Sequence, residues 1–279
     1  MGFLIVSRKR FTKAQALRTI LLAASMTVLA VPSGSAADPF VDRVVETVVG
    51  ANQNPDFSDP DLVLGPPEAW GDEAIGGSLH VYNLGSGGSI TVEFTDEVVY
   101  DGEGYDFSVF ENPFYIGGSF DQVFLETARV AVSSDNIAYV TFPVNYLPQD
   151  PPLEFDARPD HYVGFAGVRP VFTNSSNGVN PLDPDVSGGD HFDLADIAVL
   201  AASAGVDINN IRFIRITDIV AGSLDDDLPP DDPDPIPETS MAEQNGFDLD
   251  AIAVLNGRPA SPPDSLPAGI EHSLWEVFY

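Results

Sequence analysis

The chain of 279 residues contains no cysteine. This absence excludes disulfide bonds, thiolate metal ligands and a cysteine nucleophile. The Gly-x-Ser-x-Gly motif of serine hydrolases is absent as well. Of the four histidines, only His191 lies among acidic residues, so a zinc site would need distant residues to converge. Oxygen is therefore the ligand atom that this sequence offers in quantity.

Positive charge is scarce, and part of it lies at the N-terminus. Five basic residues precede an apolar run from Thr19 to Val31 and a small-residue cleavage region: Arg8, Lys9, Arg10, Lys13 and Arg18. This arrangement predicts a signal peptide over residues 1–36 and an exported bacterial protein, secreted or at the cell surface. Residues 7–13 resemble a twin-arginine signal, but Lys9 and Thr12 depart from it, so this route and the general secretory route both stay open.

Removing that segment leaves seven arginines, no lysine and all 43 acids, a net charge of −36. Such a field repels phosphates, which argues against nucleic acid and anionic membrane surfaces as partners, and it attracts divalent cations. Acid-rich, lysine-free surfaces also suit saline surroundings. Both explanations can hold together.

The residues after the signal predict an all-β fold, a jelly-roll type of antiparallel β-sandwich. Short apolar segments alternate with turns rich in Gly and Pro, and no long helical period appears. We expect a glycine hairpin at residues 85–88, one β domain over residues 37–258 with an acidic, Pro-rich insertion at 223–246, and a tail at 259–279 without a membrane anchor. The expected strands cover residues 42–49, 79–84, 89–94, 106–114, 128–133, 138–142, 162–168 and 211–217.

One nine-residue pattern occurs twice, at Phe192–Leu200 and Phe247–Leu255. Each copy begins with an aromatic residue and Asp, and ends with Ile-Ala-Val-Leu, a run of strand-like composition. Two strands in matching orientation would gather the four carboxylates of the copies at one end of the sandwich: Asp193, Asp196, Asp248 and Asp250. Crowded carboxylates call for a cation such as Ca²⁺, although Asp also caps turns without one.

Two further stretches predict oxygen ligands. Asp183, Asp185 and Ser187, followed by Gly188, match the front half of a calcium loop that Asp190 or Asp193 would complete, but Leu194 stands where the loop needs Glu. The alternative is a Ser-Gly-Gly turn carrying acids. At the end of the strand expected over 106–114, Glu111 or Asn112 also offers ligands, with turn chemistry as the alternative.

Aromatic residues beside loops provide surfaces on which sugar rings can stack, although most such rings belong to core edges. We expect two or three of them to contact a ligand, and choose Trp70, Tyr115 and Tyr162 for this role.

Several blocks together resemble a group of secreted bacterial cell surface proteins. They are Leu64-Gly65-Pro66-Pro67, which is similar to a turn of galactose-binding-like and discoidin-like jelly rolls, the glycine hairpin, Asp106–Asn112, Ser187–Leu194 and Gly246–Asp250. The resemblance implies an extracellular β-sandwich. A fainter similarity, in the Phe-Asp-Leu blocks, is to surface lipoproteins that bind corrinoids, but the lipobox cysteine is missing.

The expected function is therefore non-enzymatic: a calcium-stabilised β-sandwich that binds a glycan or another extracellular surface component. Two alternatives stay open. A pair of carboxylates would suffice for a glycan-active enzyme, and a structural element of an extracellular matrix would need no pocket.

Overall fold

The computed structural model describes residues 38–71, 76–147, 156–220 and 246–260. The predicted signal peptide lies outside these ranges, as do most of the predicted acidic insertion and most of the predicted tail.

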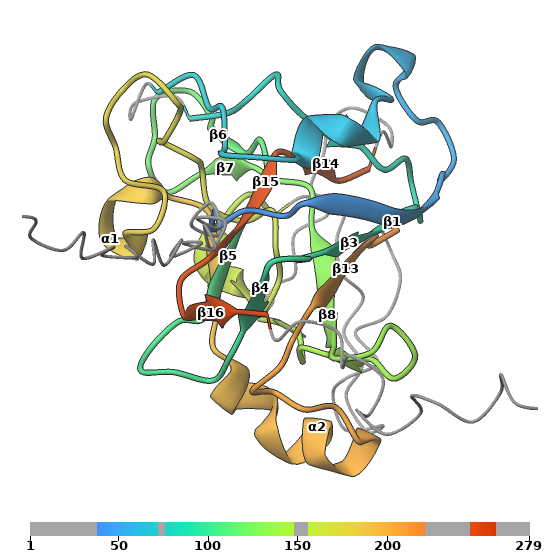
Figure 1. Cartoon of the computed structure of the whole chain (residues 1–279). Helices are drawn as coiled ribbons and strands as arrows, with labels where there is room; N and C mark the ends of the chain where they lie inside the picture. Colours follow the sequence, from blue (N-terminus) through green and yellow to red (C-terminus); the bar gives the residue numbers. More distant parts are fainter. Residues whose placement is uncertain (1–37, 72–75, 148–155, 221–245, 261–279) are drawn as a thin grey trace, which may run out of the picture. The chain divides into compact units, whose positions relative to one another are not determined.

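Two antiparallel sheets form the main body of the protein (Figure 1). The larger sheet contains five strands, in the order β1 (Arg43–Val48), β3 (Ser89–Glu93), β13 (Phe213–Asp218), β8 (Ala128–Ser133) and β9 (Val140–Thr141). The smaller sheet contains three, in the order β12 (Asp190–Phe192), β5 (Phe107–Phe110) and β15 (Ala251–Val254).

Shorter elements surround these sheets. Four two-stranded pairs are β2 (Tyr82–Asn83) with β14 (Asp248–Leu249), β4 (Glu97–Val99) with β16 (Gly257–Pro259), β6 (Phe114–Tyr115) with β7 (Val123–Phe124), and β10 (Asn145–Tyr146) with β11 (Tyr162–Val163). The helices are α1 (Pro184–Ser187) and α2 (Ala198–Ala204), and the 3-10 turns cover Pro55–Phe57, Pro60–Val63, Pro159–His161 and Leu194–Ile197.

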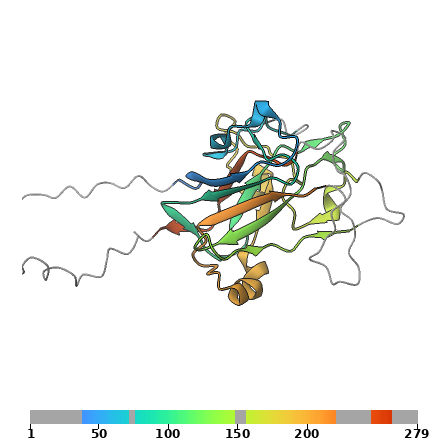
Figure 2. The ribbon, with the colours of Figure 1, turned by 90° about the vertical axis from the view of Figure 1, so that its right-hand side faces the viewer.

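The core lies between the two sheets because their strands alternate in polarity. In β3 and β13, Ile90 pairs with Ile216 and Val92 with Ile214, and all four are fully buried. They share one apolar cluster with residues of the smaller sheet such as Phe107. Figure 2 shows the strands of the larger sheet side by side, with α2 beyond their lower edge. The predicted all-β antiparallel sandwich is confirmed, and the jelly-roll strand order stays a prediction.

The smaller sheet is covered on both faces. Phe107 of β5 faces the main core, whereas Phe110 belongs to a second cluster with Ala251 and Ala253 of β15 and Val171. Residues directly after β5 and directly before β15 are therefore in the interior of the protein, where they form a buried polar centre.

The strand prediction for the first repeat is wrong. Residues 194–197 form a 3-10 turn and Ala198–Ala204 form α2, whereas the matching segment of the second repeat is β15. Asp193 accepts a hydrogen bond from the backbone N–H of Ala195 (2.9 Å) and so caps the turn. The residues that follow are rich in alanine, which has the highest helix propensity.

The predicted glycine hairpin is also wrong. β2 pairs with β14, and β3 pairs with β1 and β13, so residues 85–88 connect two different sheets instead of neighbouring strands. The glycines there permit close approach, because a Cβ on Gly88 would lie 2.1 Å from the carbonyl oxygen of Leu84.

None of the helices within the described ranges has the length and apolar character needed to cross a membrane.

Candidate metal centre

The site is built around the end of β5 and the start of β14. The pairing of β5 with β15 ends at Phe110, opposite Ala251, and Glu111 and Asn112 follow directly. Strand alternation would place these two side chains on opposite faces. Because the strand has already ended, both reach Asp248: the backbone N–H of Asp248 donates to Glu111 Oε1 (3.1 Å), and Asn112 Nδ2 donates to Asp248 Oδ2 (3.0 Å).

A tight turn delivers Asp248 to this position. Gly246 has a φ of +80°, and a Cβ there would lie 2.5 Å from the carbonyl carbon of Gly85, so only glycine fits without a shift of the backbone. The next backbone N–H, that of Phe247, donates to Asp218 Oδ1 (2.8 Å). Asn83 on β2 donates to Asp248 Oδ1 (2.7 Å). Each carboxylate oxygen of Asp248 thus accepts one amide hydrogen bond and keeps a further lone pair.

Glu111, Glu126 and Asp248 bring carboxylate oxygens within 4.8 Å of one another. Glu111 is only 1% exposed, and its Oε2 has no hydrogen-bond partner. A buried acceptor without a partner is destabilising by about 1–3 kcal/mol, and more for a charged group, so native structures seldom contain one without a reason. Glu111 Oε2 lies among other acids without a partner, and it is therefore a candidate ligand for a cation.

The three carboxylates hold their protons unusually tightly. Burial raises the pKa of Glu111 well above its usual value, and the charges of Glu126 and Asp248 raise it further. Burial and the charges of Asp248 and Asp218 raise the pKa of Glu126 to about 8. Burial also raises the pKa of Asp248 to about 6, against the lowering effect of its two amide donors.

The charged groups that shift the pKa values of Glu111, Glu126 and Asp248 are other acids. Carboxylates that repel one another in this way bind protons or a metal ion, and oxygen-only ligands favour hard cations such as Ca²⁺ or Mg²⁺.

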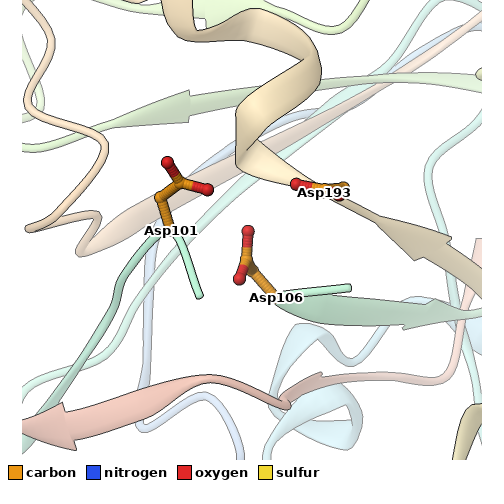
Figure 3. Close-up of side chains that lie close together, drawn as sticks. All are labelled: Asp101, Asp106 and Asp193. Atoms are coloured by element: carbon orange, nitrogen blue, oxygen red, sulfur yellow. The ribbon is translucent and has the colours of Figure 1, made fainter. Parts of the chain in front are cut away.

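A second acidic group shows the contrasting case (Figure 3). Asp101, Asp106 and Asp193 also bring carboxylate oxygens within 4.8 Å of one another. Here the oxygens of Asp106 accept from the N–H groups of Gly102 (2.9 Å) and Leu194 (2.7 Å) and from Asn256 Nδ2 (2.9 Å). These bonds account for Asp106 as a turn residue, and Asp193 is the cap of the turn at Leu194–Ile197. Turn and cap chemistry is the alternative that the sequence left open.

The two repeats lie at opposite ends of β5. β12 and β15 both run antiparallel to β5, with Phe192 opposite Phe107 and Ala251 opposite Phe110. The first repeat therefore starts where β12 ends, whereas the second starts before β15 begins. Asp193 joins the Asp106 group and Asp248 joins the Glu111 group, so the predicted single cluster of four carboxylates does not form.

The other two Asp residues of the repeats, Asp250 and Asp196, lie outside both carboxylate groups. Asp250, which is 1% exposed, accepts from the backbone N–H of Glu68 (3.1 Å) and thereby anchors the Pro-Pro turn to the smaller sheet. Burial raises the pKa of Asp250 to about 7. Asp196 is exposed. Neither belongs to the two carboxylate groups found among the described residues.

Within the stretch that resembles the front half of a calcium loop, Pro184–Ser187 form a helical turn. Asp183 caps this turn by accepting from the Asp185 N–H (3.2 Å), and Ser187 is buried and donates to the carbonyl oxygen of Gly188 (3.0 Å). Neither Asp183 nor Asp185 belongs to the carboxylate groups found within 4.8 Å of one another among the described residues. Asp190 is 6% exposed and accepts from the N–H of Val168 (2.9 Å).

Two of the three predicted ligand-binding aromatics line hollows. Tyr162 lines one pocket of about 510 Å³, and Tyr115 lines a neighbouring one of about 510 Å³. Trp70 is 51% exposed and lines neither.

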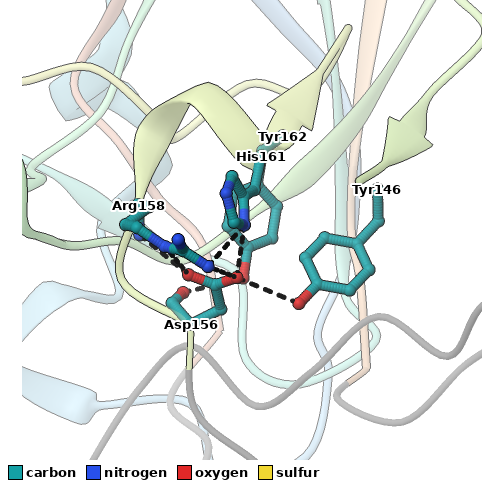
Figure 4. A network of polar contacts seen from close by, with 5 residues as sticks. All are labelled: Tyr146, Asp156, Arg158, His161 and Tyr162. Carbon is teal, nitrogen blue, oxygen red and sulfur yellow. Dashed lines mark hydrogen bonds and ion pairs between the residues drawn. The ribbon is translucent and has the colours of Figure 1, made fainter. Parts of the chain in front are cut away.

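The hydroxyl of Tyr162 is already engaged, because it donates to the Asp156 carbonyl oxygen (2.8 Å) (Figure 4). Asp156 is fully buried and accepts from Arg158 and Tyr146 and contacts His161. Burial alone would raise the pKa of Asp156, but the hydrogen bonds from Arg158 and His161 outweigh burial and hold the pKa below its usual value. This network is a satisfied buried ion pair that fixes β10 and β11.

Sequence reasoning missed Glu126, and it missed the pairing of Ser108 with His191. A lone acid inside the apolar run from Val123 to Val132 was the available signal for Glu126. Ser108 Oγ lies 2.8 Å from His191 Nδ1, but Ser108 is fully buried and His191 Nε2 lies 3.2 Å from the Pro184 carbonyl oxygen. The pair is therefore a structural contact between β5 and β12, where no substrate can reach the hydroxyl.

Comparison of the chain with protein-family models gives no match, and comparison with curated proteins gives no similar sequence. The candidate function therefore follows from the site alone.

Proposed function

We propose that this protein is an exported, calcium-stabilised β-sandwich that binds a glycan or another extracellular surface component without turning it over. The observation that carries the calcium part is the unpartnered Oε2 of Glu111, buried among the carboxylates of Glu126 and Asp248. A bound divalent cation would give this atom a partner and offset the mutual repulsion of the three acids.

The ion would act mainly on stability. The centre joins segments that are distant in the sequence, namely the end of β5, the start of β14 and the segment between β7 and β8 that carries Glu126. A ligand that binds the folded state alone stabilises it by about 2.7 kcal/mol when its concentration is 100 times the dissociation constant. For a domain of this size, that corresponds to a rise of roughly 5–11 °C in melting temperature.

The burial of Glu111 supports binding over glycan cleavage. Paired catalytic carboxylates must flank a sugar in an open cleft. Glu111 is 1% exposed and Asp248 is 9% exposed, so a sugar ring cannot pass between them. The exposed aromatic and polar residues around the two pockets supply the surface for a glycan instead.

The test uses metal-stripped mature protein. We expect added Ca²⁺ to raise the melting temperature by several degrees relative to chelator, and elemental analysis of the untreated protein to show bound calcium. Glu111→Gln should lose most of this rise, whereas Asp101→Asn, a matched loss of one acid in the other group, should keep it. Equal melting temperatures with Ca²⁺, Mg²⁺ and chelator would overturn the calcium part. A larger rise with Mg²⁺ would assign the centre to that ion.

Glycan binding needs its own measurement. The calcium-loaded protein should bind a subset of sugars on a glycan array and release no product from labelled polysaccharides. Product release that is lost in a carboxylate variant of unchanged melting temperature would establish the enzymatic alternative instead.

A further inference from the structure

The two pockets beside β12 form one groove, which we call the Arg169 groove. They share the lining residues Tyr105, Pro159, Arg169 and His191, and each has a volume of about 510 Å³. Small-molecule sites commonly range from roughly 300 to 1,000 Å³, so the groove has room for more than one sugar unit.

Arg169 provides the positive charge of this groove. It is exposed, and among the described residues no carboxylate oxygen lies within 4.0 Å of its guanidinium. Four other arginines, Arg43, Arg158, Arg212 and Arg215, do have such a carboxylate partner. An exposed arginine without a carboxylate oxygen within 4.0 Å is available to a ligand, and its planar fork matches a carboxylate.

The backbone around Arg169 is fixed from behind by Asp190. The carboxylate of Asp190 accepts the N–H of Val168 at 2.9 Å. This hydrogen bond to a buried carboxylate anchors the backbone beside Arg169. An anchored backbone lowers the entropy lost when the loop binds a ligand.

The wall next to Arg169 is apolar and aromatic. The ring centroids of Tyr105 and His191 lie 5.3 Å apart, and Tyr105 is 47% exposed. His191 is held on both sides, by Ser108 Oγ at 2.8 Å and by the Pro184 carbonyl oxygen at 3.2 Å. A half-exposed tyrosine on a fixed support offers a flat face to the C–H groups of a sugar ring.

The rim carries hydrogen-bond acceptors. Asp160, Asp185 and Asp196 line the groove, and all three are exposed. Ionised carboxylates accept hydrogen bonds and donate none. They accept hydrogen bonds from the hydroxyl groups of a sugar, and because they repel anions, a sugar carboxylate fits at Arg169 and not at the rim.

We propose that the Arg169 groove binds a glycan that contains uronic acid. One sugar carboxylate pairs with the Arg169 guanidinium, the hydroxyl groups donate to the rim aspartates, and the ring packs against Tyr105. This inference rests on the proposed glycan-binding function and narrows it to acidic sugars. It does not depend on which divalent ion occupies the Glu111 centre.

The test compares two trisaccharides by titration calorimetry at saturating Ca²⁺. One is built of galacturonic acid and the other of galactose with the same linkage, so they differ only in the carboxylates. We expect the acidic trisaccharide to bind at least tenfold more tightly. Arg169→Gln should abolish this preference, and Arg169→Lys should restore only part of it because a lysine lacks the planar fork.

Arg258→Gln is the matched control, because it removes the same charge from β16, outside the groove, where Arg258 donates to the Asn209 carbonyl oxygen (2.7 Å). It should bind both sugars like the wild type, and the melting temperatures of all variants should agree within a few degrees. Equal affinity for the two trisaccharides would overturn the acidic preference and leave glycan binding intact. If neither trisaccharide bound while a glycan array showed binding of other sugars, the assignment of the groove would be wrong and the glycan-binding function would stand. If no sugar bound at all, both the groove and the glycan-binding function would be refuted.

Inorganic phosphate serves as a competitor. Displacement of the acidic trisaccharide by phosphate at equal concentration would show a simple anion site and overturn the role of the rim aspartates.

Discussion

Glu126→Gln isolates the charge at the metal centre, because glutamine keeps the shape of the side chain and removes one negative charge. Glu126 has a pKa of about 8 in the folded protein against 4.5 in the unfolded chain. A carboxyl group whose pKa is raised on folding favours the folded state while it is protonated, and this contribution is lost as pH rises from 4.5 towards 8. In chelator, the wild type should therefore lose stability across that window, and the variant should lose less.

The size of the effect follows from the same values. Each pH unit between the two pKa values changes the free energy of unfolding by about 1.4 kcal/mol, so at pH 7.5 the effect is at most about 4 kcal/mol. Glu126 is partly open to solvent, which reduces the effect to roughly 2 kcal/mol. We expect metal-free Glu126→Gln to melt about 4–8 °C above the metal-free wild type at pH 7.5, and at the same temperature at pH 4.

Differential scanning calorimetry at pH 4 and pH 7.5, with chelator and with Ca²⁺, gives the complete comparison. In Ca²⁺ the order should reverse, because the variant has lost a ligand that the ion needs. A variant that is less stable than the wild type in chelator at pH 7.5, or one that keeps the full calcium response, would refute the reasoning.

Two further predictions concern the framework around the site. Gly246→Ala should lower the free energy of unfolding by at least about 2 kcal/mol, because the φ of +80° at this position and the 2.5 Å approach to Gly85 leave no place for a Cβ. Urea titrations measure this change, and an unchanged unfolding midpoint would contradict the prediction. Asp156→Asn should be destabilising by about 2–4 kcal/mol at pH 7, since Arg158 and His161 lose their buried partner. The lowered pKa of Asp156 contributes stability above pH 3.8 that is lost on acidification, so the two proteins should converge at low pH; a constant difference would argue against this ion pair.

The sequence predicted the sandwich because apolar and polar residues alternate along the central strands of the larger sheet. Alternation in β3 and β13 marks the core positions, and β8 covers the predicted residues 128–133. Residues 162–168 do not form one continuous strand, since the strand covers only Tyr162 and Val163 and Ala166 makes an isolated bridge to Ala128. Gly164 and Gly167 in that segment adopt positive φ values and break the extended conformation.

The site was only partly predictable. Glu111 and Asp248 could be predicted as candidate ligands because each is an acid at the end of an expected strand. Glu126 lies close to Glu111 and Asp248 because of the tertiary arrangement of the strands, and a local sequence pattern does not predict such a contact. The prediction for the first repeat was wrong because a short apolar run fits a strand and a helix equally well. In the structure, Asp193 caps a 3-10 turn that leads into α2.

Gly167 links the two proposed sites. It lies so close to the segment of Glu126 that a Cβ would be 2.0 Å from the Glu126 carbonyl oxygen, and two residues later the same loop carries Arg169. A shift of the Glu126 backbone on ion binding would thus press directly on the loop that presents the guanidinium. By thermodynamic reciprocity, the factor by which the bound ion changes the affinity for sugar equals the factor by which bound sugar changes the affinity for the ion. If the ion strengthens sugar binding, a polysaccharide surface would retain calcium in the bound protein at ion concentrations where the same protein in solution releases it.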